Sequence, residues 1–379
     1  MAMPQVGGPV PFLPNIVYRS PQVADWEQNV YARHFWHPVA VRTELPEGGA
    51  LSLELLGTPL LLTQPVGQGP RAFLNRCPHR GLALLEPGAA APACRKLICP
   101  YHGWTYGPDG KLWAAAREAQ FCEPFDRRRW DLTPLDCGQA GPFLWVRLPV
   151  LAQEAGIDPG SGPALLDQLD LLQEQGGWGS RSSPWASPPE LLGRRQRSLA
   201  CNWKIAHDNT LDDYHVAIAH PTTLHRLQGP VQGYRHAFGN WCNLLATQLP
   251  TSVGTSGEFL TFAVPPWNHL LVWPNGTVAL IGFHPEALDR CRMELTLAGP
   301  AERQSGAAVL LDELAAFLEE DRRLVEAAQR AYGSGFEPGP AHGLERRILH
   351  HHSLYRAELE RSGGPQAAGL SGAALNSSG

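Results

Sequence analysis

The strongest constraint on this chain is a pair of short Cys/His motifs, Cys77-Pro-His79 and Cys99-Pro-Tyr-His102. Thiolate and imidazole are ligands suited to zinc or iron. Structural zinc sites commonly space their paired ligands by about two to four residues, so the single residue between Cys77 and His79 is tight for that geometry. An iron–sulfur cluster with two Cys on one iron and two His on the other needs one Cys and one His from each loop. The motifs supply that set, and a structural zinc or a metal-free pair of loops are the alternatives.

The residues around these motifs form short alternating segments separated by turns. From about residue 35 to 150 they include HPVAVRTEL, ALSLELLGTPLLLTQPV, RAFLNRC and PFLWVRLP, with PEGG and GPDG as turn signals. This pattern predicts a small antiparallel β-domain. Before it, SPQVADWEQNVYARHF has a helical apolar rhythm with Ser20 as the expected N-cap.

The second half of the chain mixes helical and strand patterns. Residues 156–177 contain a short amphipathic helix pattern, and a Gly/Ser/Pro-rich connector follows at 176–192. A helix is expected at 202–221, alternating strands at 238–298, a long helix at 307–332 and another near 345–361. The small polar residues of 363–379 predict a flexible tail.

Charge and composition narrow the class of protein. The net charge of −5 carries no basic signature for nucleic acid, and no apolar run reaches the roughly 18 residues of a membrane span. The first residues lack the pattern of a signal peptide, so we expect a cytoplasmic protein whose eight cysteines do not form a disulfide framework. No GxGxxG follows a strand, which argues against a nicotinamide or flavin site on this chain.

The first pair of motifs resembles a known kind of site. CPHRG and CPYHGW, with RAFLNRC before and TYGPDGKL after, resemble the two cluster-binding loops of Rieske proteins of the oxygenase type. The resemblance implies a Rieske [2Fe-2S] cluster held by Cys77, His79, Cys99 and His102. The 19 residues between His79 and Cys99 are slightly more than the family leads us to expect. The extra length falls in EPGAAAPAC, where a loop can absorb it, and Cys94 within it is expected to be a free or buried thiol.

A second candidate motif is NWKIAHDNTLDDYHVAIAHP, which contains His215 and His220. On an ideal helix of about 3.6 residues per turn, side chains five apart diverge by about 140°. They could not share a metal there. Pro221 disfavours helical backbone at His220, so His220 is expected to leave the helix and turn back toward His215. Taken alone, two histidines at this spacing are also compatible with an ordinary helix surface.

Across its length this motif resembles the mononuclear-iron segment of Rieske non-haem iron oxygenases. The resemblance implies an iron held by His215, His220 and a carboxylate from elsewhere in the chain. EEDRRLVEAAQ resembles the acidic C-terminal helix of the family, which makes Asp321 the expected third ligand and Glu320 its competitor. The alternative is a solvated acidic helix face, to which Glu319 and Glu326 are expected to belong.

The resemblance also gives Asp212 a role, as the carboxylate that bridges the two metal sites across a subunit boundary. It would accept hydrogen bonds from His102 of one subunit and from His215 of the next. An exposed helix acid is the alternative reading for Asp212. His207 and His225 are expected to be bystanders.

As a whole, the resemblance implies an α+β protein with an N-terminal all-β Rieske domain, followed by a helix-grip (START/Bet v1-like) catalytic domain with an antiparallel sheet. The expected domains are a lead-in helix at 1–33 packing on the catalytic domain, the Rieske domain at 34–150, the catalytic mononuclear iron domain at 151–362 and the tail at 363–379.

The implied activity is that of an oxygenase. It would use O₂ and reductase-supplied electrons to mono- or dioxygenate a small organic substrate, most readily an aromatic or cyclic one. Oxidative demethylation or hydroxylation of a quaternary ammonium compound is the alternative, and a Rieske electron carrier without oxygenase activity is the alternative of another class.

Partners and pocket are implied as well. A separate NAD(P)H-dependent reductase or ferredoxin would deliver the electrons, and the chain would form a homotrimer, with or without small beta subunits. Aromatic residues at 238–283 are expected to line the substrate pocket if they do not simply fill the core; they are Phe238, Trp241, Phe259, Phe262, Trp267, Trp273 and Phe283.

Overall fold

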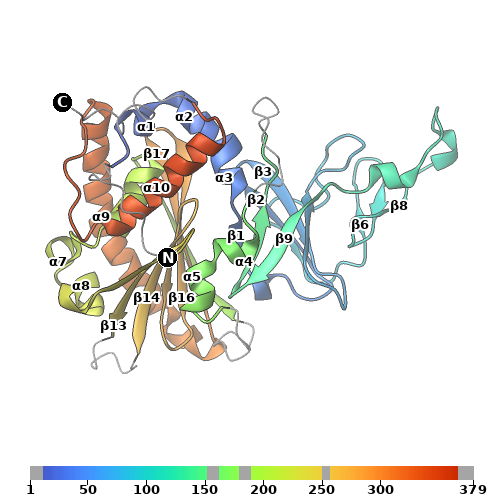
Figure 1. The fold of residues 1–379 in the computed structure, drawn as a ribbon. Coiled ribbons are helices and arrows are strands. Elements are labelled where there is room, and N and C mark those ends of the chain that lie inside the picture. The colour runs from blue at the N-terminus through green and yellow to red at the C-terminus, as the bar shows by residue number, and fades with distance from the viewer. Residues whose placement is uncertain (1–11, 152–161, 179–188, 250–256, 366–379) are drawn as a thin grey trace. The chain divides into compact units, whose positions relative to one another are not determined.

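The computed structural model describes residues 12–151, 162–178, 189–249 and 257–365. These residues form two compact units (Figure 1). Of the described residues, the first unit, called the β unit here, comprises 36–149 with 189–191, and the second, the α+β unit, comprises the rest. Each unit contains an antiparallel sheet and the second adds the long helices, so the expected α+β class is confirmed.

The β unit is built on a seven-stranded sheet in the order β1-β10-β9-β4-β3-β2-β5 and a three-stranded sheet in the order β6-β7-β8. The strands are β1 (His37–Val41), β2 (Ala50–Leu55), β3 (Thr58–Thr63), β4 (Arg71–Leu74), β5 (Ala90–Ala91), β6 (Leu97–Ile98), β7 (Thr105–Tyr106), β8 (Leu112–Ala114), β9 (Pro134–Ala140) and β10 (Phe143–Arg147). Short 3₁₀ turns are η2 (Arg42–Glu44), η3 (Glu118–Gln120) and η4 (Arg127–Trp130).

Two apolar clusters form the core of the β unit. One packs strands β2, β3 and β10 through buried leucines and valines such as Leu60 and Val146. The other lies under the two motif loops and includes Cys77, Cys99 and Trp104. The loops therefore rest on a packed base, which restricts the positions that their ligating side chains can take.

The α+β unit is built on a second seven-stranded sheet, in the order β11-β17-β16-β15-β14-β13-β12, and the neighbouring pairs from β12 to β17 are antiparallel. Its strands are β11 (Glu190–Leu199), β12 (Arg235–Phe238), β13 (Asn243–Gln248), β14 (Glu258–Val264), β15 (Asn268–Val272), β16 (Val278–Ala287) and β17 (Arg290–Gly299). The central strands are nearly continuous apolar sequence because both of their faces are covered.

The helices of the α+β unit come from the N-terminal segment, the middle and the C-terminal part of the chain (Figure 1). They are α1 (Ile16–Arg19), α2 (Pro21–Trp26), the π-helical η1 (Glu27–Tyr31), α3 (Ala32–His34), α4 (Leu165–Gln168), α5 (Asp170–Glu174), α6 (Trp203–Leu211), α7 (Val216–Ala219), α8 (Leu224–Gln228), η5 (Val231–Gly233), η7 (Ala301–Gly306), α9 (Ala307–Gly333) and α10 (Arg346–Arg361). Helix α6 packs against β15, β16, α9 and α10. Ser20 caps α2 as expected, its side-chain oxygen accepting a hydrogen bond from the amide of Val23 at 3.4 Å.

The first helices are held to the centre of the α+β unit by one buried carboxylate. Glu27 accepts hydrogen bonds from Lys204 Nζ at 2.6 Å, Trp203 Nε1 at 2.9 Å and Tyr355 Oη at 2.5 Å. A buried charge with three donors is fully satisfied. Helices α6 and α10 are thereby joined to the N-terminal segment.

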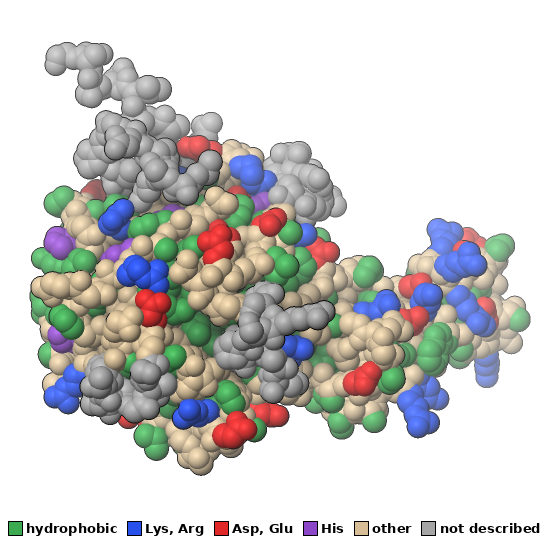
Figure 2. Space-filling model, turned by 60° about the horizontal axis from the view of Figure 1, so that its bottom comes forward, with side chains coloured by type: hydrophobic (Ala, Val, Ile, Leu, Met, Phe, Trp, Pro, Cys, Tyr) green, Lys and Arg blue, Asp and Glu red, His purple; other side chains and the backbone are tan. Residues whose placement is uncertain are grey.

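The expected long helix at 307–332 is confirmed as α9, whereas the helix pattern at 156–177 forms the two short helices α4 and α5. Much of the expected connector and most of the expected tail lie outside the described residues. Within the part of the chain that the structure describes, no helix has the length and apolar character needed to cross a membrane. On the face shown in Figure 2, basic and acidic side chains are interspersed over the larger body.

Candidate metal centres

The segment 202–221 does not form one helix, so that expectation is wrong. Helix α6 ends at Leu211, and Asp212 takes an extended conformation. The Asp212 Oδ1 atom accepts hydrogen bonds from the amides of Tyr214, at 2.8 Å, and His215, at 3.3 Å. An aspartate that bonds to the backbone two and three residues ahead stabilises a turn at the expense of the helix, and here it interrupts the helix before the first histidine.

The short helix α7 then separates the two histidines. His215 directly precedes it and His220 directly follows it. The backbone of His220 is not helical, with φ of −123° and ψ of 47°. Pro221 comes next, so the expectation that His220 leaves the helix is confirmed. The break at Asp212 and the end at His220 together allow two side chains five residues apart to face one point.

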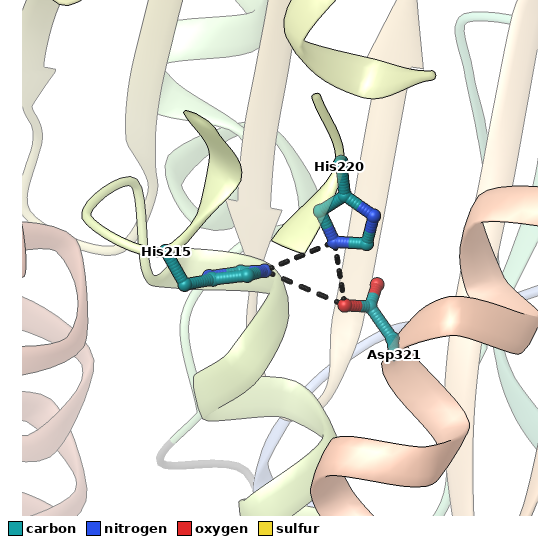
Figure 3. Close-up of side chains that lie close together, drawn as sticks. All are labelled: His215, His220 and Asp321. Atoms are coloured by element: carbon teal, nitrogen blue, oxygen red, sulfur yellow. Dashed lines mark hydrogen bonds and ion pairs between the residues drawn. The ribbon is translucent and has the colours of Figure 1, made fainter. Parts of the chain in front are cut away.

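Three side chains converge at that point (Figure 3). His215 Nε2 lies 3.1 Å from His220 Nε2, and Asp321 Oδ1 lies 2.8 Å from His220 Nε2 and 3.4 Å from His215 Nε2. Asp321 comes from α9, about a hundred residues further along the chain. Among the described residues, this is the group of His, Cys, Asp and Glu that brings three possible ligand atoms within 4.8 Å of one another.

The arrangement fits a metal ion. If one Nε2 donates a hydrogen bond to the other, only the lone pair of the accepting nitrogen is used. The Asp321 carboxylate adds a further lone pair directed at the same point. A 2-His-1-carboxylate set with open positions is the ligand set of non-haem iron(II) sites. The side chain of His220 is fully buried and that of Asp321 is 12% exposed, so the ligand atoms are largely shielded from water.

The electrostatics favour positive charge at this point. Burial lowers the pKa of His215, but hydrogen bonds and charges from Asp212 and Asp321 outweigh it and raise that pKa to about 10. Burial raises the pKa of Asp321, and the two histidines more than reverse this, so its pKa is lowered. The same balance, with Asp321 and Glu320 as partners, raises the pKa of His220. Either a proton or a metal cation between the two imidazoles and the Asp321 carboxylate supplies the positive charge that these groups favour.

The outer nitrogens of both histidines also face carboxylates. His220 Nδ1 lies 2.6 Å from Glu320 Oε2, which accepts a second hydrogen bond from Thr223 Oγ1 at 2.8 Å. His215 Nδ1 lies 3.4 Å from Asp212 Oδ2, an ion-pair distance. A carboxylate on Nδ1 favours the tautomer whose free lone pair is on Nε2. Glu320, the expected competitor of Asp321, therefore lies on the outer side of His220.

The two motif loops of the β unit share one backbone geometry. In each, the Cys amide donates to the carbonyl five residues ahead, Leu82 at 2.7 Å and Trp104 at 2.8 Å. In each, the amide of the Gly four residues after the Cys donates back to the Cys carbonyl, and both glycines have positive φ. The loops thus match although one has His at the second position after Cys and the other at the third.

The side chains of these loops meet in a way that fits a two-iron cluster. The Cys77 and Cys99 side chains are buried, and the rings of His79 and His102 lie 4.5 Å apart between centroids. The Nδ1 atom of His79 is buried and has no hydrogen-bond partner. Burial raises the pKa of the Cys77 thiol, and burial with the charge of His102 lowers the pKa of His79. A neutral imidazole and a thiol that loses its proton to a metal are the donors that such a cluster requires.

Packing orients the two rings. His79 stacks on Trp104 at 4.9 Å and an interplanar angle of 3°, and His102 stacks on Tyr101 at 3.8 Å. Cys94, between the motifs, is a buried free thiol whose Sγ lies 3.7 Å from the carbonyl of Lys96, as expected.

A cavity lies beside His215 and Asp321, and its lining differs from the expected one. Strands β15 and β16 contribute to it, but the aromatic residues expected there do not line it, and Phe259, Phe262 and Trp267 are fully buried in the core instead. The described lining residues besides the metal-site group are Asn209, Thr210, Asp213, Val216, Leu224, Gln228, His269, Leu271, Ile281 and Phe317. His269 was not expected there. Asn209 precedes His215 by six residues on the same motif, and no sequence signal pointed to His269.

Two family descriptions match this chain. Residues 35–124 match the Rieske [2Fe-2S] domain, and residues 187–361 match the catalytic domain of the ring hydroxylating alpha subunit. These domains imply the Rieske cluster and mononuclear iron. The expected cofactors are thus confirmed.

Individual relatives include both mono- and dioxygenases. The carnitine monooxygenase oxygenase subunit of Acinetobacter baumannii is 28% identical over 231 residues, 60% of this chain and 57% of the relative. This chain therefore spans little more than half the length of that relative. The anthranilate 1,2-dioxygenase large subunit of Acinetobacter baylyi is 28% identical over 236 residues, 59% of this chain and 48% of the relative.

A solved structure shares the fold. The quaternary ammonium Rieske monooxygenase CntA, in complex with L-carnitine, superposes with a TM-score of 0.75 at 23% identity, covering 92% of this chain and 96% of that one. The two family matches together cover more than half of the sequence, and the chain belongs to the ring-hydroxylating alpha subunits that carry a Rieske [2Fe-2S] domain.

Proposed function

We propose that this chain is the oxygenase component of a Rieske oxygenase system that adds oxygen from O₂ to a small organic substrate. The convergence of His215, His220 and Asp321 beside a cavity carries the proposal. A pure electron carrier has no use for this second ligand set. Names of the relatives, all mono- or dioxygenases, support the same activity.

Under this proposal, Cys77, His79, Cys99 and His102 hold the [2Fe-2S] cluster. His215, His220 and Asp321 hold the mononuclear iron. The cluster supplies electrons one at a time, and the iron supplies a site where O₂ and substrate react. Within the oxygenase, the binding of substrate and the orientation of the ligands come from protein side chains.

Asp212 is proposed as the electron bridge between the cluster of one subunit and the iron of its neighbour. One of its oxygens, Oδ1, holds the turn before His215, while Oδ2 lies near His215 Nδ1. The side chain is 22% exposed. It is therefore free to accept a hydrogen bond from His102 of the neighbouring subunit.

Glu320 and Asp212 face Nδ1 of the two ligand imidazoles and would hold the proton there, which would leave both Nε2 lone pairs for the iron. The apolar part of the cavity, from Val216, Leu271, Ile281 and Phe317, would exclude water and orient the substrate. Asn209, Thr210 and Gln228 offer it hydrogen bonds.

For the substrate, two classes have specific support. The apolar wall with a few polar groups suits an aromatic or cyclic molecule. The names of the relatives favour a quaternary ammonium compound. Among the described lining residues Phe317 is the one benzenoid ring, whereas an ammonium cage usually presents several aromatic faces.

The partners follow from the proposed activity. Electrons would come from a separate NAD(P)H-dependent reductase or a ferredoxin, and the bridging role of Asp212 requires a homotrimer or another assembly that pairs cluster and iron between subunits. None of the eight cysteines forms a disulfide, which supports a reducing, cytoplasmic location.

Metal analysis and spectroscopy of the anaerobically purified chain test this function. An oxygenase holds about three irons per chain, an electron carrier about two, and a zinc protein none. The reduced protein should show a Rieske-type electron paramagnetic resonance signal, and its absence would rule the proposal out. Reductant-dependent O₂ uptake with aromatic acids, cyclic terpenoid-like compounds and betaines then separates the substrate classes.

A further inference from the structure

Three buried histidines outside the metal ligands lie in the interior of the α+β unit. His269 is on β15, His207 on α6 and His351 on α10, and their side chains are 5%, 0% and 3% exposed. We call these three residues the imidazole chain. Sequence reasoning treated His207 as a bystander and did not single out the other two.

The imidazole chain contains ring nitrogens with no protein partner. Both nitrogens of His207, Nδ1 of His269 and Nε2 of His351 are buried without a hydrogen bond. The carbonyl of Asn268 lies near the ring of His207 and favours its charged form slightly, but it does not reach hydrogen-bond geometry. A buried polar atom left unpaired costs about 1–3 kcal/mol, and ordered water is the usual partner of such atoms. The unpaired nitrogens are therefore positions at which ordered water is expected.

The path begins at the metal centre. His269 lines the same cavity as His215 and Asp321. Its strand β15 packs against α6, the helix that carries His207. The rings of His207 and His351 lie 4.4 Å apart between centroids, at 59° to each other.

The path ends at a carboxylate with access to solvent. The ring of His352 lies 6.4 Å from that of His351, and its Nε2 is 3.0 Å from Asp208 Oδ1. Tyr18 Oη donates a hydrogen bond of 2.8 Å to the other Asp208 oxygen. The Asp208 side chain is 14% exposed, so the chain of polar groups connects the cavity with the surface.

The three rings are neutral, and their surroundings explain why. Burial, together with His269, Arg347 and His352, lowers the pKa of His207 to about 3. Burial lowers the pKa of His269 and His351 far below the ordinary value; Arg347 adds to this at His269, and His207, His352 and His350 add to it at His351 against Asp208. A neutral imidazole has one N–H donor and one acceptor nitrogen. It can take up a proton at one nitrogen while it releases the proton from its other nitrogen, so no ring has to stay charged.

The imidazole chain is not a second metal site. Among the described residues, its nitrogens do not form a group of three possible ligand atoms within 4.8 Å, as the His215 group does. We propose that His269, His207 and His351, bridged by ordered water, form a proton relay from Asp208 to the cavity beside His215. The relay rests on the proposed function for the use made of the protons.

The reaction requires such a supply. Monooxygenation breaks a C–H bond and the O–O bond, forms a C–O–H group and releases the second oxygen atom as water. It consumes two electrons, from the reduced protein partner, and two protons, from solvent. Dioxygenation to a dihydrodiol consumes the same numbers. The cavity has an apolar wall, so a defined path for protons has a clear role.

A high-resolution crystal structure of the iron-loaded protein gives a test that does not depend on turnover. The relay requires ordered water within about 3.2 Å of both His207 nitrogens, continuing toward His269 and His351. Dry apolar packing around His207, or water at neither nitrogen, would overturn the proposal.

Two substitutions at His207 test the function of the path. His207→Phe removes both nitrogens, and His207→Asn keeps a hydrogen-bonding side chain that cannot pass a proton through itself. Both are expected to lower oxygenation at least about tenfold, to raise the solvent deuterium isotope effect on turnover, and to leave KM and iron content unchanged. His34→Gln is the control, since His34 is a buried imidazole of the same unit that pairs with Glu358 rather than with the chain.

The outcomes separate the two proposals. If His207→Asn turns over within twofold of the unchanged protein with the same isotope effect, the relay is wrong. Should His207→Phe fail to bind iron, the turnover and the isotope effect of His207→Asn decide whether the relay is correct. A protein that consumes no O₂ with any substrate would overturn the proposed oxygenase, and the water positions at His207 would then decide the hydrated path independently.

Discussion

At the scale of single residues, the metal centre depends on which imidazole nitrogen each carboxylate faces. Asp321 faces both Nε2 atoms of the histidine pair, whereas Glu320 faces the Nδ1 atom of His220. Neighbours in sequence on α9 thus take opposite sides of one imidazole. The sequence alone left the choice between them open, because both belong to the same acidic run.

We predict that Asp321→Ala removes the mononuclear iron and leaves the cluster, since Asp321 belongs to one ligand set only. Iron content should fall from about three to about two per chain, with the Rieske signal unchanged. Glu320→Gln should retain iron but bind it about 10–100-fold more weakly. Glu319→Gln, on the exposed face with Arg322, serves as the control. Loss of the cluster in Asp321→Ala would show that the assignment is wrong.

A pH dependence follows from the pKa of His215. In the metal-free protein this pKa is raised to about 10 from an ordinary value near 6.5. The stabilisation from the protonated ring is therefore complete below about pH 6.5 and is lost as the pH rises toward 10. Chemical denaturation of the metal-free protein between pH 6 and about 10 should show this loss of unfolding free energy, and His215→Gln should reduce it. A flat profile in the unsubstituted protein would contradict the raised pKa.

At the scale of elements, loops and helix ends position the ligands. Two matched Cys–Gly loops present the cluster ligands, and the break of α6 at Asp212 presents His215. Behind the break, Arg347 of α10 holds Asp213 in the interior. Its guanidinium lies 3.3 Å from Asp213 Oδ1 and donates to Asn243 Oδ1 at 2.8 Å and to the Thr261 carbonyl at 3.1 Å.

We predict that Arg347→Met destabilises the α+β unit by about 3–5 kcal/mol, because it removes the guanidinium from the buried Asp213 carboxylate and leaves only His236 Nε2, 2.8 Å from the other oxygen, as an ion-pair partner. The double substitution Asp213→Asn, Arg347→Met should recover part of that loss. Urea denaturation of the four proteins in the double-mutant cycle measures both effects. Equal stability of the single and double variants would mean that the pair is not coupled.

Replacing a loop glycine is expected to lower the free energy of unfolding less than replacing Arg347, and for a different reason. Gly103 has a φ of 71°, and a Cβ added there meets no other atom within 4 Å. Gly103→Ala should therefore cost about 1–2 kcal/mol from backbone strain alone, with the cluster retained. Gly110→Ala should cost more, because its Cβ would also meet the ring of Phe73. Thermal unfolding followed by cluster absorbance compares the two.

At the scale of the whole molecule, the proposed function requires that one chain supply the cluster and another the iron. The two ligand sets lie in different compact units, and Asp212, whose Oδ2 faces His215 Nδ1, is the residue that we propose as the bridge to a neighbour. Electron transfer between subunits is thus a property that one chain alone cannot show.

Complementation between subunits tests it. Co-expressed His102→Ala and Asp321→Ala chains should assemble into mixed oligomers in which intact cluster and intact iron meet across some boundaries, restoring part of the reductant-dependent turnover that each variant lacks. Asp212→Ala should lower turnover while both metal centres stay loaded. Inactive mixed oligomers containing both centres would argue for electron transfer within one chain.

The sequence by itself determined the ligand types and the architecture that holds them. Cys77, His79, Cys99 and His102 lie in short loops, where local spacing and the two glycines set the geometry. Alternating and helical periods predicted the β-domain and the long helix α9, the family resemblance implied the α+β class, and Pro221 correctly indicated that His220 leaves its helix. Tertiary structure decided what depends on distant segments: the approach of Asp321 from α9, the outer position of Glu320 and the burial of the aromatic residues expected in the pocket. It also brought together His207, His269 and His351 from three elements, which no local pattern encodes, because contacts between segments distant in sequence are set by packing of the whole core.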